Sequence, residues 1–307
     1  MMNKIAVLMC TYNGENNLRE QINSIMRQNG VSVSLYVRDD GSNDKTLEIL
    51  EEYHLNGDLT WFQGENIGPA AGFMELLYQT ANEDYDYFAF SDQDDIWLET
   101  KLLDAVEKIE DCMDSQYILY GANQTLLKDG IPTDNVYDEM PILTTPYLLD
   151  HNKIAGCTMV INRKLARLIA ESDHINTSVL KSRMHDLWLT LIASTCGKVV
   201  FDMNPTMLYR IHEHNVVGEA DISFKTRIAR IKKDRGDRSN SRSRYAAELL
   251  RCFDRYIKKE EKHVLELYAN YRHSVSTKLK FLGATKLIKQ TGENTILFRI
   301  KILLNYI

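Results

Sequence analysis

Short apolar runs alternate with helical patterns in the first third of the chain. Four runs have the length of strands, at residues 5–10, 35–37, 59–63 and 87–90. Each run is followed by a polar loop, and then by apolar residues three or four positions apart, as on one face of a helix. Strands and helices that alternate in this way predict an α/β fold, with a largely parallel sheet and helices on both of its faces.

The loops after these four runs are rich in acids, amides and hydroxyl groups, and they cover residues 11–14, 38–44, 66–68 and 91–95. In a parallel sheet they share one edge, beyond the carboxyl ends of the strands, where such sheets bind ligands. Neither a Gly-x-Gly-x-x-Gly nor a Gly-Lys-Ser/Thr phosphate loop is present in the sequence. Each loop alone is also ordinary turn chemistry, but four of them at one edge predict a binding site.

Three carboxylates, those of Asp92, Asp94 and Asp95, directly follow the apolar run 87–90. Acids this close repel one another, which costs stability unless a cation or several hydrogen-bond donors meet them. One interpretation is a divalent metal site, and the other is a solvated turn that leads into a helix. Because the pattern is short, it favours the turn when it is taken alone.

Weaker patterns continue after the acidic loop. We expect a helix over residues 98–113, and strands at 117–122, 159–161 and 199–201. Residues 124–153 contain three prolines and little periodicity, which indicates a lid or an insertion that faces the substrate.

A further acid, Asp186, directly precedes the apolar helical segment 187–192. Its position suits a helix N-cap or first-turn acid, and caps are commoner than catalytic acids. Downstream, residues 209–215 are dense in hydrogen-bonding groups. His212 and His214 invite a metal interpretation, but no third ligand stands nearby, so contact with solvent or a phosphate is favoured.

Composition places the chain among ordinary globular proteins, with 44% hydrophobic and 26% charged residues. The five cysteines are scattered and form no Cys-x-x-Cys pair, so neither a disulfide framework nor a zinc site is expected. We expect no signal peptide, because only a short segment with Lys4 precedes the first strand, and no apolar run approaches the ~20 residues of a membrane span. A reducing cytoplasm is the expected location.

The net charge of -6 hides an asymmetry between the two ends of the chain. Residues 221–307 carry 21 Lys and Arg against 9 Asp and Glu, a net +12, whereas residues 1–220 carry a net -18. A basic tail of this kind suggests an anionic partner, either a nucleic acid or a phospholipid leaflet. No nucleic-acid-binding motif accompanies the charge, so a nucleic-acid partner is not expected.

Two apolar stripes run through this basic tail at helical spacing. Their residues are Leu249, Phe253, Tyr256 and Ile257 in the first stripe, and Ile296, Ile300, Leu303 and Ile307 in the second. Ordinary helices packed on the main domain and peripheral attachment to an anionic bilayer explain these stripes equally well.

Taken together, five motifs resemble family 2 glycosyltransferases of the GT-A fold in order and spacing. They are Cys-Thr-Tyr-Asn-Gly at 10–14, Arg-Asp-Asp-Gly-Ser-Asn-Asp at 38–44, Asn-Ile-Gly at 66–68, Ser-Asp-Gln-Asp-Asp-Ile-Trp at 91–97 and Met-His-Asp at 184–186. The resemblance implies a Rossmann-like nucleotide-diphospho-sugar transferase with a mixed, mainly parallel sheet. It spans roughly residues 4–218, so we expect a catalytic domain at 1–218 and a basic helical extension at 219–307.

The resemblance also implies roles for individual residues. Asp94 and Asp92 match a site for Mg or Mn, with Asp92 nearer the ribose, and Asp186 matches the general base. Arg210 matches a contact to the diphosphate. The nucleotide pocket is matched by Thr11, Tyr12, Asn13, Asp39, Asp40 and Asn66. Weaker matches, to contacts with the sugar or the acceptor, are Asp95, Trp97, Gly156, His185 and His212.

Two segments, residues 91–97 and 209–218, are similar to those of bacterial rhamnosyltransferases that build cell-wall and O-antigen polysaccharides. The implied reaction is transfer of L-rhamnose from dTDP-L-rhamnose, with inversion, to a lipid-linked glycan at the inner face of the plasma membrane. UDP-galactose or UDP-glucose is the alternative donor. From another class, a nucleic-acid- or membrane-binding protein acting through the tail remains an alternative, and the intact acids disfavour a non-catalytic scaffold.

Overall fold

The computed structural model describes residues 2–112, 114–211 and 240–307. Contacts divide the chain into two compact units. The first comprises Met1–Pro141, Ile154–Ser172 and Gly197–His212, and the second comprises Ile142–Lys153, Asp173–Cys196 and Glu213–Ile307. The predicted domain boundary at residues 218 and 219 lies outside the described residues and stays a prediction. The second unit also takes in two segments that precede this boundary.

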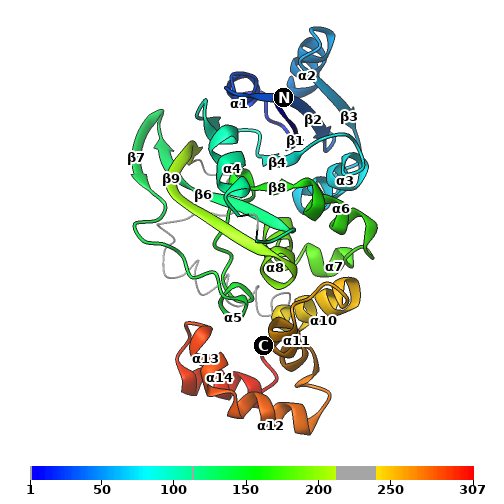
Figure 1. Cartoon of the computed structure of the whole chain (residues 1–307). Helices are drawn as coiled ribbons and strands as arrows, with labels where there is room; N and C mark the ends of the chain where they lie inside the picture. Colours follow the sequence, from blue (N-terminus) through cyan, green and yellow to red (C-terminus); the bar gives the residue numbers. More distant parts are fainter. Residues whose placement is uncertain (1, 113, 212–239) are drawn as a thin grey trace. The chain divides into compact units, whose positions relative to one another are not determined.

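Within the described residues, the first unit is built on one nine-stranded sheet (Figure 1). Its strand order is β3-β2-β1-β4-β8-β6-β9-β5, and β7 pairs with β6. The pairs among β3, β2, β1 and β4 are parallel, as is β6 with β9, whereas β8 pairs antiparallel with both of its neighbours. The predicted mixed sheet is confirmed, but it is not mainly parallel: among the described strands the four parallel pairs stand beside four antiparallel ones, β4 with β8, β6 with β8, β6 with β7 and β5 with β9. The strands are β1 (Asn3–Thr11), β2 (Val31–Asp39), β3 (Leu59–Gln63), β4 (Tyr87–Ser91), β5 (Ile96–Trp97), β6 (Ile118–Lys128), β7 (Ile131–Asn135), β8 (Val160–Asn162) and β9 (Lys198–Arg210).

Helices cover both faces of this sheet, because side chains alternate between the faces along each strand. On one face, Ile5, Val7 and Met9 of β1 share a buried core with the helices α1, α2 and α4. On the other face, α3 and α6 contact the strands, and Phe73 of α3 lies with its ring centroid 6.0 Å from that of Phe90. The helices are α1 (Leu18–Met26), α2 (Thr46–Leu55), α3 (Pro69–Thr80), α4 (Lys101–Glu110) and α6 (Arg163–Glu171).

The segment 124–153, predicted as a lid or an insertion that faces the substrate, begins with regular strands, and its role stays a prediction. Strand β6 continues to Lys128, and β7 returns beside it after a two-residue turn at Asp129 and Gly130. Both turn residues have positive φ, 51° and 78°, as type I′ hairpins require. The strands are hard to see in the sequence because register shifts along β6 interrupt the alternation of apolar and polar residues.

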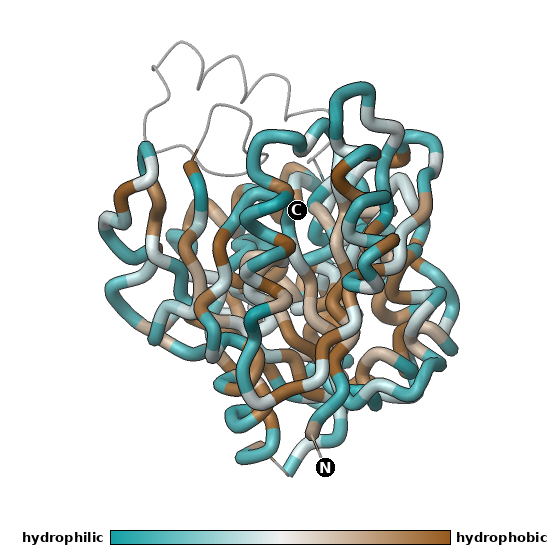
Figure 2. Tube along the Cα trace, turned by 90° about the horizontal axis from the view of Figure 1, so that it is seen from above, coloured by the Kyte–Doolittle hydropathy of each residue, from teal (hydrophilic) through white to brown (hydrophobic). Residues whose placement is uncertain are grey.

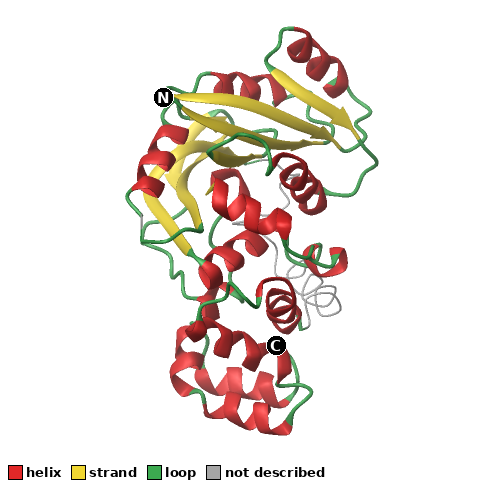
Figure 3. Cartoon of the chain, turned by 45° about the vertical axis from the view of Figure 1, so that its right-hand side comes forward, coloured by secondary structure: helices red, strands yellow, loops and turns green. Residues whose placement is uncertain are grey.

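The second unit is helical in the part of the chain that the structure describes (Figure 3). Every residue of α8 except Asp186 is buried, and the ring centroid of Trp188 lies 5.9 Å from that of Tyr245 and 5.8 Å from that of Phe253. Helix α8 is therefore the centre around which this unit packs. The helices are α5 (Thr145–Leu148), α7 (Thr177–Leu180), α8 (His185–Cys196), α10 (Ser241–Phe253), α11 (Lys259–Asn270), α12 (Val275–Gly283), α13 (Thr285–Gln290) and α14 (Thr295–Leu303).

The two apolar stripes predicted in the basic tail differ in burial. Figure 2 shows the apolar and hydrophilic positions along the chain. Leu249 and Phe253 are buried in α10, which ends before Tyr256. Of the second stripe, Ile296, Ile300 and Leu303 of α14 are exposed, whereas Ile307, which follows the helix, is buried. None of the helices that the structure describes is both long and apolar enough to cross a membrane.

Candidate active site

The carboxyl ends of four parallel strands meet at one edge of the sheet. Thr11 at the end of β1 is paired with Asp39 at the end of β2, and Asp39 with Gln63 at the end of β3. Ser91, which ends β4, is paired with Met9 of β1. The predicted convergence of the four polar loops at one edge is thereby confirmed.

Gln93 ties the loop after β4 to the loop after β1. Its Oε1 accepts a hydrogen bond from Thr11 Oγ1 at 2.5 Å and another from the backbone N–H of Tyr12 at 2.9 Å, and its Nε2 donates to the carbonyl of Tyr12 at 3.2 Å. A Cβ atom at Gly14 would come within 2.5 Å of Gln93 Oε1, so a larger residue there would displace the Gln93 amide from this arrangement. The ring of Tyr12 stays exposed, as stacking on a ligand requires.

The loop after β2 is held by side chains of its own and of the neighbouring loop. Buried Asp39 accepts backbone bonds from Gly41 and Ser42 and a bond from the Ser42 hydroxyl. Asn13, at a φ of 49°, accepts from the N–H of Asn43 at 2.8 Å, and its own N–H donates to Ser42 Oγ at 2.8 Å. Asp39 and Asn13 therefore shape the loops, and their predicted contacts to a nucleotide stay predictions.

Asp40 is buried in an ion pair with Arg38, and it also accepts a bond from the N–H of Gly68 at 2.8 Å. Arg38 in turn pairs with Glu75 of α3 at 2.8 Å. Buried charges of this kind need such partners, because an unpaired one is costly. The network fixes the loop before α3, in which Asn66 is exposed.

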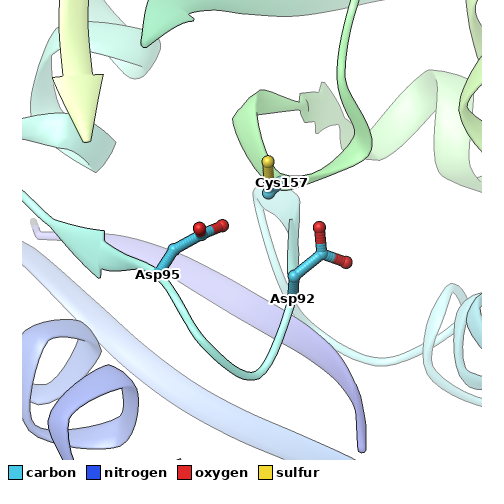
Figure 4. Close-up of side chains that lie close together, drawn as sticks. All are labelled: Asp92, Asp95 and Cys157. Atoms are coloured by element: carbon cyan, nitrogen blue, oxygen red, sulfur yellow. The ribbon is translucent and has the colours of Figure 1, made fainter. Parts of the chain in front are cut away.

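Asp92, Asp95 and Cys157 place two carboxylate oxygens and a sulfur within 4.8 Å of one another (Figure 4). Asp95 is buried, and burial together with the charges of Asp92 and Asp94 raises its pKa well above the usual range. Burial, followed by the charges of Asp95 and Asp92, likewise raises the pKa of the Cys157 thiol well above its ordinary value. The pocket thus disfavours further negative charge.

These groups fit a hard divalent cation through their carboxylates. Mg and Mn prefer oxygen ligands, and a thiol that keeps its proton is a poor ligand for them. A cation beside Asp92 also offsets the repulsion that raises the pKa of Asp95. Asp94, predicted as the direct ligand, lies outside the group formed by Asp92, Asp95 and Cys157.

Arg210, the last residue of β9, holds the acidic loop in place. Its backbone N–H donates to Asp95 Oδ1 at 3.1 Å, and its Nε donates to the carbonyl oxygen of Asp94 at 2.8 Å. The same guanidinium pairs with Glu20 of α1 at 2.6 Å. The structure therefore assigns Arg210 a positioning contact that sequence reasoning missed, and its contact with a diphosphate stays a prediction.

Lys101 is a fully buried cation beneath the acidic loop. Its Nζ lies 4.7 Å from the ring centroid of Trp97 and 3.9 Å from the Met207 sulfur. Burial lowers the pKa of Lys101 to about 8, against the opposing influence of Cys157 and Asp95. Trp97 is 3% exposed and Asp95 1%, so both occupy supporting positions. This burial does not favour the predicted contacts of these two side chains with a sugar.

In the second unit, Asp186 lies in the first turn of α8. Its Oδ1 accepts the N–H of Leu187 at 2.7 Å, and its Oδ2 accepts a bond from Asn152 Nδ2 at 2.6 Å. Asp186 is partly exposed, but removal of most water from its carboxyl group raises its pKa to about 6, although these two hydrogen bonds oppose the shift. A carboxylate whose pKa lies near neutrality is suited to accept a proton.

The backbone that leads into Asp186 is strained. Met184 has a φ of 75°, a conformation that L-residues rarely adopt and that costs on the order of 1–3 kcal/mol. The Tyr245 hydroxyl donates to the carbonyl of Leu180 at 3.1 Å and lies 3.4 Å from that of Met184, which braces this turn. Strain of this kind persists where the surrounding structure fixes it, often at functional sites.

Of the weaker predictions, His185 is buried beside Asp186, and burial lowers its pKa to about 3, so the imidazole is neutral. Gly156 is partly exposed in the short helix η1 (Gly156–Thr158), which also carries Cys157. His212 and His214 lie outside the described residues.

Comparison with known sequences decides the family. The sequence model of "Glycosyl transferase family 2" matches residues 6–165, which is more than half of the chain. The chain belongs to glycosyltransferase family 2. This glycosyltransferase is 33% identical over 237 residues to the dTDP-rhamnosyl transferase RfbG of Shigella flexneri, an alignment that covers 73% of this chain and 78% of the relative.

Two solved structures show that the glycosyltransferase has the GT-A fold. Residues 1–349 of S. aureus TarS in complex with UDP superpose with a TM-score of 0.61 at 18% identity, over 98% of this chain and 86% of that fragment. The mannosyltransferase PcManGT of Pyrobaculum calidifontis, in complex with GDP-Man and Mn2+, gives a TM-score of 0.56 at 13% identity, over 99% and 87% of the two chains. At these identities the likeness shows the fold alone.

The family match covers all four polar loops of the glycosyltransferase and ends before Asp186 and Arg210. Sequence reasoning missed the role of Gln93 in joining two of these loops, although the residue lies inside the motif at 91–97. Asn152 sits in a segment without periodicity, and only the fold brings it to Asp186.

Proposed function

We propose that this glycosyltransferase transfers L-rhamnose from dTDP-L-rhamnose, with inversion, to a hydroxyl group of a lipid-linked polysaccharide intermediate. The single observation that carries the donor is the 33% identity to a dTDP-rhamnosyl transferase over 73% of the chain. UDP-galactose or UDP-glucose is the second candidate donor, favoured by the UDP bound to the structurally similar TarS.

Asp186 is the proposed general base. Asn152 donates to Oδ2 of this carboxylate and so orients it in its ionised form. The carboxylate takes the proton from the acceptor hydroxyl while that oxygen forms a bond to the anomeric carbon of the donor. The bond from this carbon to the diphosphate breaks in the same step, and its electron pair leaves with the nucleoside diphosphate.

Asp92, with Asp94 or Asp95, is the proposed holder of Mg or Mn. When bound, such an ion supplies Lewis-acid stabilisation of charge on the leaving diphosphate. The protein's own part is to keep these carboxylates together, through the bonds of Arg210 to Asp94 and Asp95 and of Gln93 to the neighbouring loop. Exposed Tyr12 and Asn66 are proposed to contact the nucleotide, with Thr11, Asn13, Asp39 and Asp40 supporting the same pocket.

A donor screen tests the proposal. Purified protein is incubated with dTDP-rhamnose, UDP-galactose or UDP-glucose and a membrane extract that contains lipid-linked acceptors, and nucleotide release is measured with and without EDTA. We expect acceptor-dependent release of dTDP that EDTA abolishes and added Mn restores. Release of UDP alone would select the second donor, and turnover of none of the three sugars would overturn the proposal.

A further inference from the structure

Helix α14 exposes one apolar face while it buries the other. Phe298 and Ile302 are fully buried, and the ring of Phe298 lies against those of Tyr268 and Phe281. The opposite face carries five large apolar side chains that are 43% to 68% exposed: Ile296, Leu297, Ile300, Leu303 and Leu304. The packing of α14 in its own unit therefore accounts for only two of these seven large apolar side chains.

Helix α12 also exposes apolar side chains. It packs against α14, and it exposes Val275 to 78% and Leu279 to 64%. We call these seven exposed residues of α12 and α14 the α12–α14 face. Exposed apolar groupings of this kind mark interaction sites, because isolated surface residues do not line up along two packed helices.

The segment that carries the face is mostly positive. Residues 271–307 contain seven Lys and Arg and one acid, Glu293. That acid is held by Arg242, at 2.7 Å, and by Lys301. The surroundings of the face are therefore positive, and Lys280, Lys286 and Lys289 are exposed on α12 and α13.

The combination of apolar and basic residues favours one kind of partner over two others. A nucleic acid would satisfy the charges and leave the seven apolar side chains in water. A second copy of this chain would bring the same positive charge to the contact, which is unfavourable. An anionic phospholipid leaflet satisfies both, since acyl chains take up apolar side chains and head groups attract Lys and Arg.

We propose that the α12–α14 face attaches the protein to an anionic phospholipid surface, with α14 in the plane of the interface. A helix of nine residues suits this position, in which one face is buried at the boundary between head groups and acyl chains. The inference goes beyond the proposed reaction. It depends neither on the donor nor on the base, and it would bring the enzyme to the surface that carries a lipid-linked acceptor.

Flotation of the full chain on vesicles tests this attachment. We expect binding to phosphatidylcholine vesicles with 30% phosphatidylglycerol, much weaker binding to phosphatidylcholine alone, and weakening at high salt. The variant Ile296→Glu/Leu303→Glu should lower the vesicle partition coefficient by about tenfold or more. The variant Lys280→Glu/Lys286→Glu/Lys289→Glu should lower it by about tenfold on anionic vesicles.

The matched control is Leu55→Glu/Ile131→Glu, which places the same charges at two apolar residues of the first unit that are 76% and 66% exposed. It should bind vesicles as the unmodified protein does. All variants should keep the thermal midpoint of the unmodified protein, because every altered side chain is exposed or, for Ile296 and Leu303, outside the packed core.

Three results would overturn the proposal. The first is equal binding of the α14 variant and the control variant, and the second is no binding of the unmodified protein to anionic vesicles. The third is an oligomer, detected without lipid, that Ile296→Glu/Leu303→Glu converts to a monomer, since this would make the face a contact between copies. Donor turnover measured with detergent-solubilised acceptor is independent of all three, so failure here is distinct from failure of the proposed reaction.

Discussion

The acidic loop of the first unit and helix α14 of the second depart from the usual distribution of residues in opposite directions. In the loop, carboxylates are crowded and Asp95 is 1% exposed, whereas in α14 Ile296 and Leu304 are each 68% exposed. Both arrangements cost free energy in the isolated chain. Each cost falls when a partner binds, a cation for the acids and an apolar phase for the helix.

The two regions also differ in how the protein compensates. Arg210 donates to the backbone carbonyl of Asp94 and to the carboxylate of Asp95, so the loop is held before any ligand binds. The apolar side chains on the outer face of α14 stay exposed in the part of the chain that the structure describes. The acidic loop is therefore preorganised for a reaction, whereas the exposed face of α14 is suited only to binding a surface.

The largest expected effect is that of Asp186→Asn. Without a carboxylate that can take the acceptor proton, the rate of sugar transfer should fall by about 1,000-fold, with little change in KM for the donor. Initial rates of nucleotide release measure this. Asp173→Asn, at an exposed acid of the same unit, is the control. If Asp186→Asn released nucleotide at a rate within tenfold of that of the unmodified protein, Asp186 would not be the general base.

The two faces of α14 can be compared directly through stability. Phe298→Ala removes a fully buried ring and should cost about 3–5 kcal/mol of unfolding free energy. Leu303→Ala, on the exposed face, should change it by less than about 0.5 kcal/mol. Urea unfolding measures both variants. If both variants lost the same unfolding free energy, Leu303 would belong to the packed core, and the contrast between the two faces of α14 would be wrong.

Asp92→Asn should weaken the acidic loop as a cation site. We expect activity to fall by about 100-fold at fixed Mn, and the Mn concentration for half-maximal activity to rise. Mn should raise the thermal midpoint of the unmodified protein but not of this variant. Asp134→Asn, at an exposed acid of β7, is the control. The prediction fails if Asp92→Asn and Asp134→Asn respond to Mn alike.

The smallest effect concerns pH. Burial raises the pKa of Asp186 to about 6, and a base must be ionised, so kcat/KM should fall about tenfold per unit as pH drops below 6. The bond from Asn152 stabilises the ionised form, so Asn152→Ala should shift this acidic limb upward by about one unit. A pH profile measures the shift. If the acidic limb of the pH profile stayed at the same pH in Asn152→Ala, Asn152 would not influence the group that titrates.

Much of the first unit could be predicted because its strands are continuous apolar runs that end in polar loops. The pairing of Thr11, Asp39 and Gln63 at one edge follows from parallel strands alone. The hairpin at Asp129 and Gly130 was missed, because register shifts hide the alternation along β6.

In the candidate site, residue types were predictable and their partners were not. Gln93, Asn152 and Lys101 act through contacts 34 or more residues distant, which no local pattern encodes. The burial of Trp97 and Asp95 likewise depends on β9 and α4, which pack there from distant parts of the sequence.

The most direct test of the central claim is the NMR spectrum of the product formed from dTDP-β-L-rhamnose. A single displacement with Asp186 as base predicts an α-linked rhamnoside, made by the unmodified protein and reduced by about 1,000-fold with Asp186→Asn. A β-linked product would contradict this account, since retention requires two successive displacements, and so would an α-linked product formed equally fast by the variant.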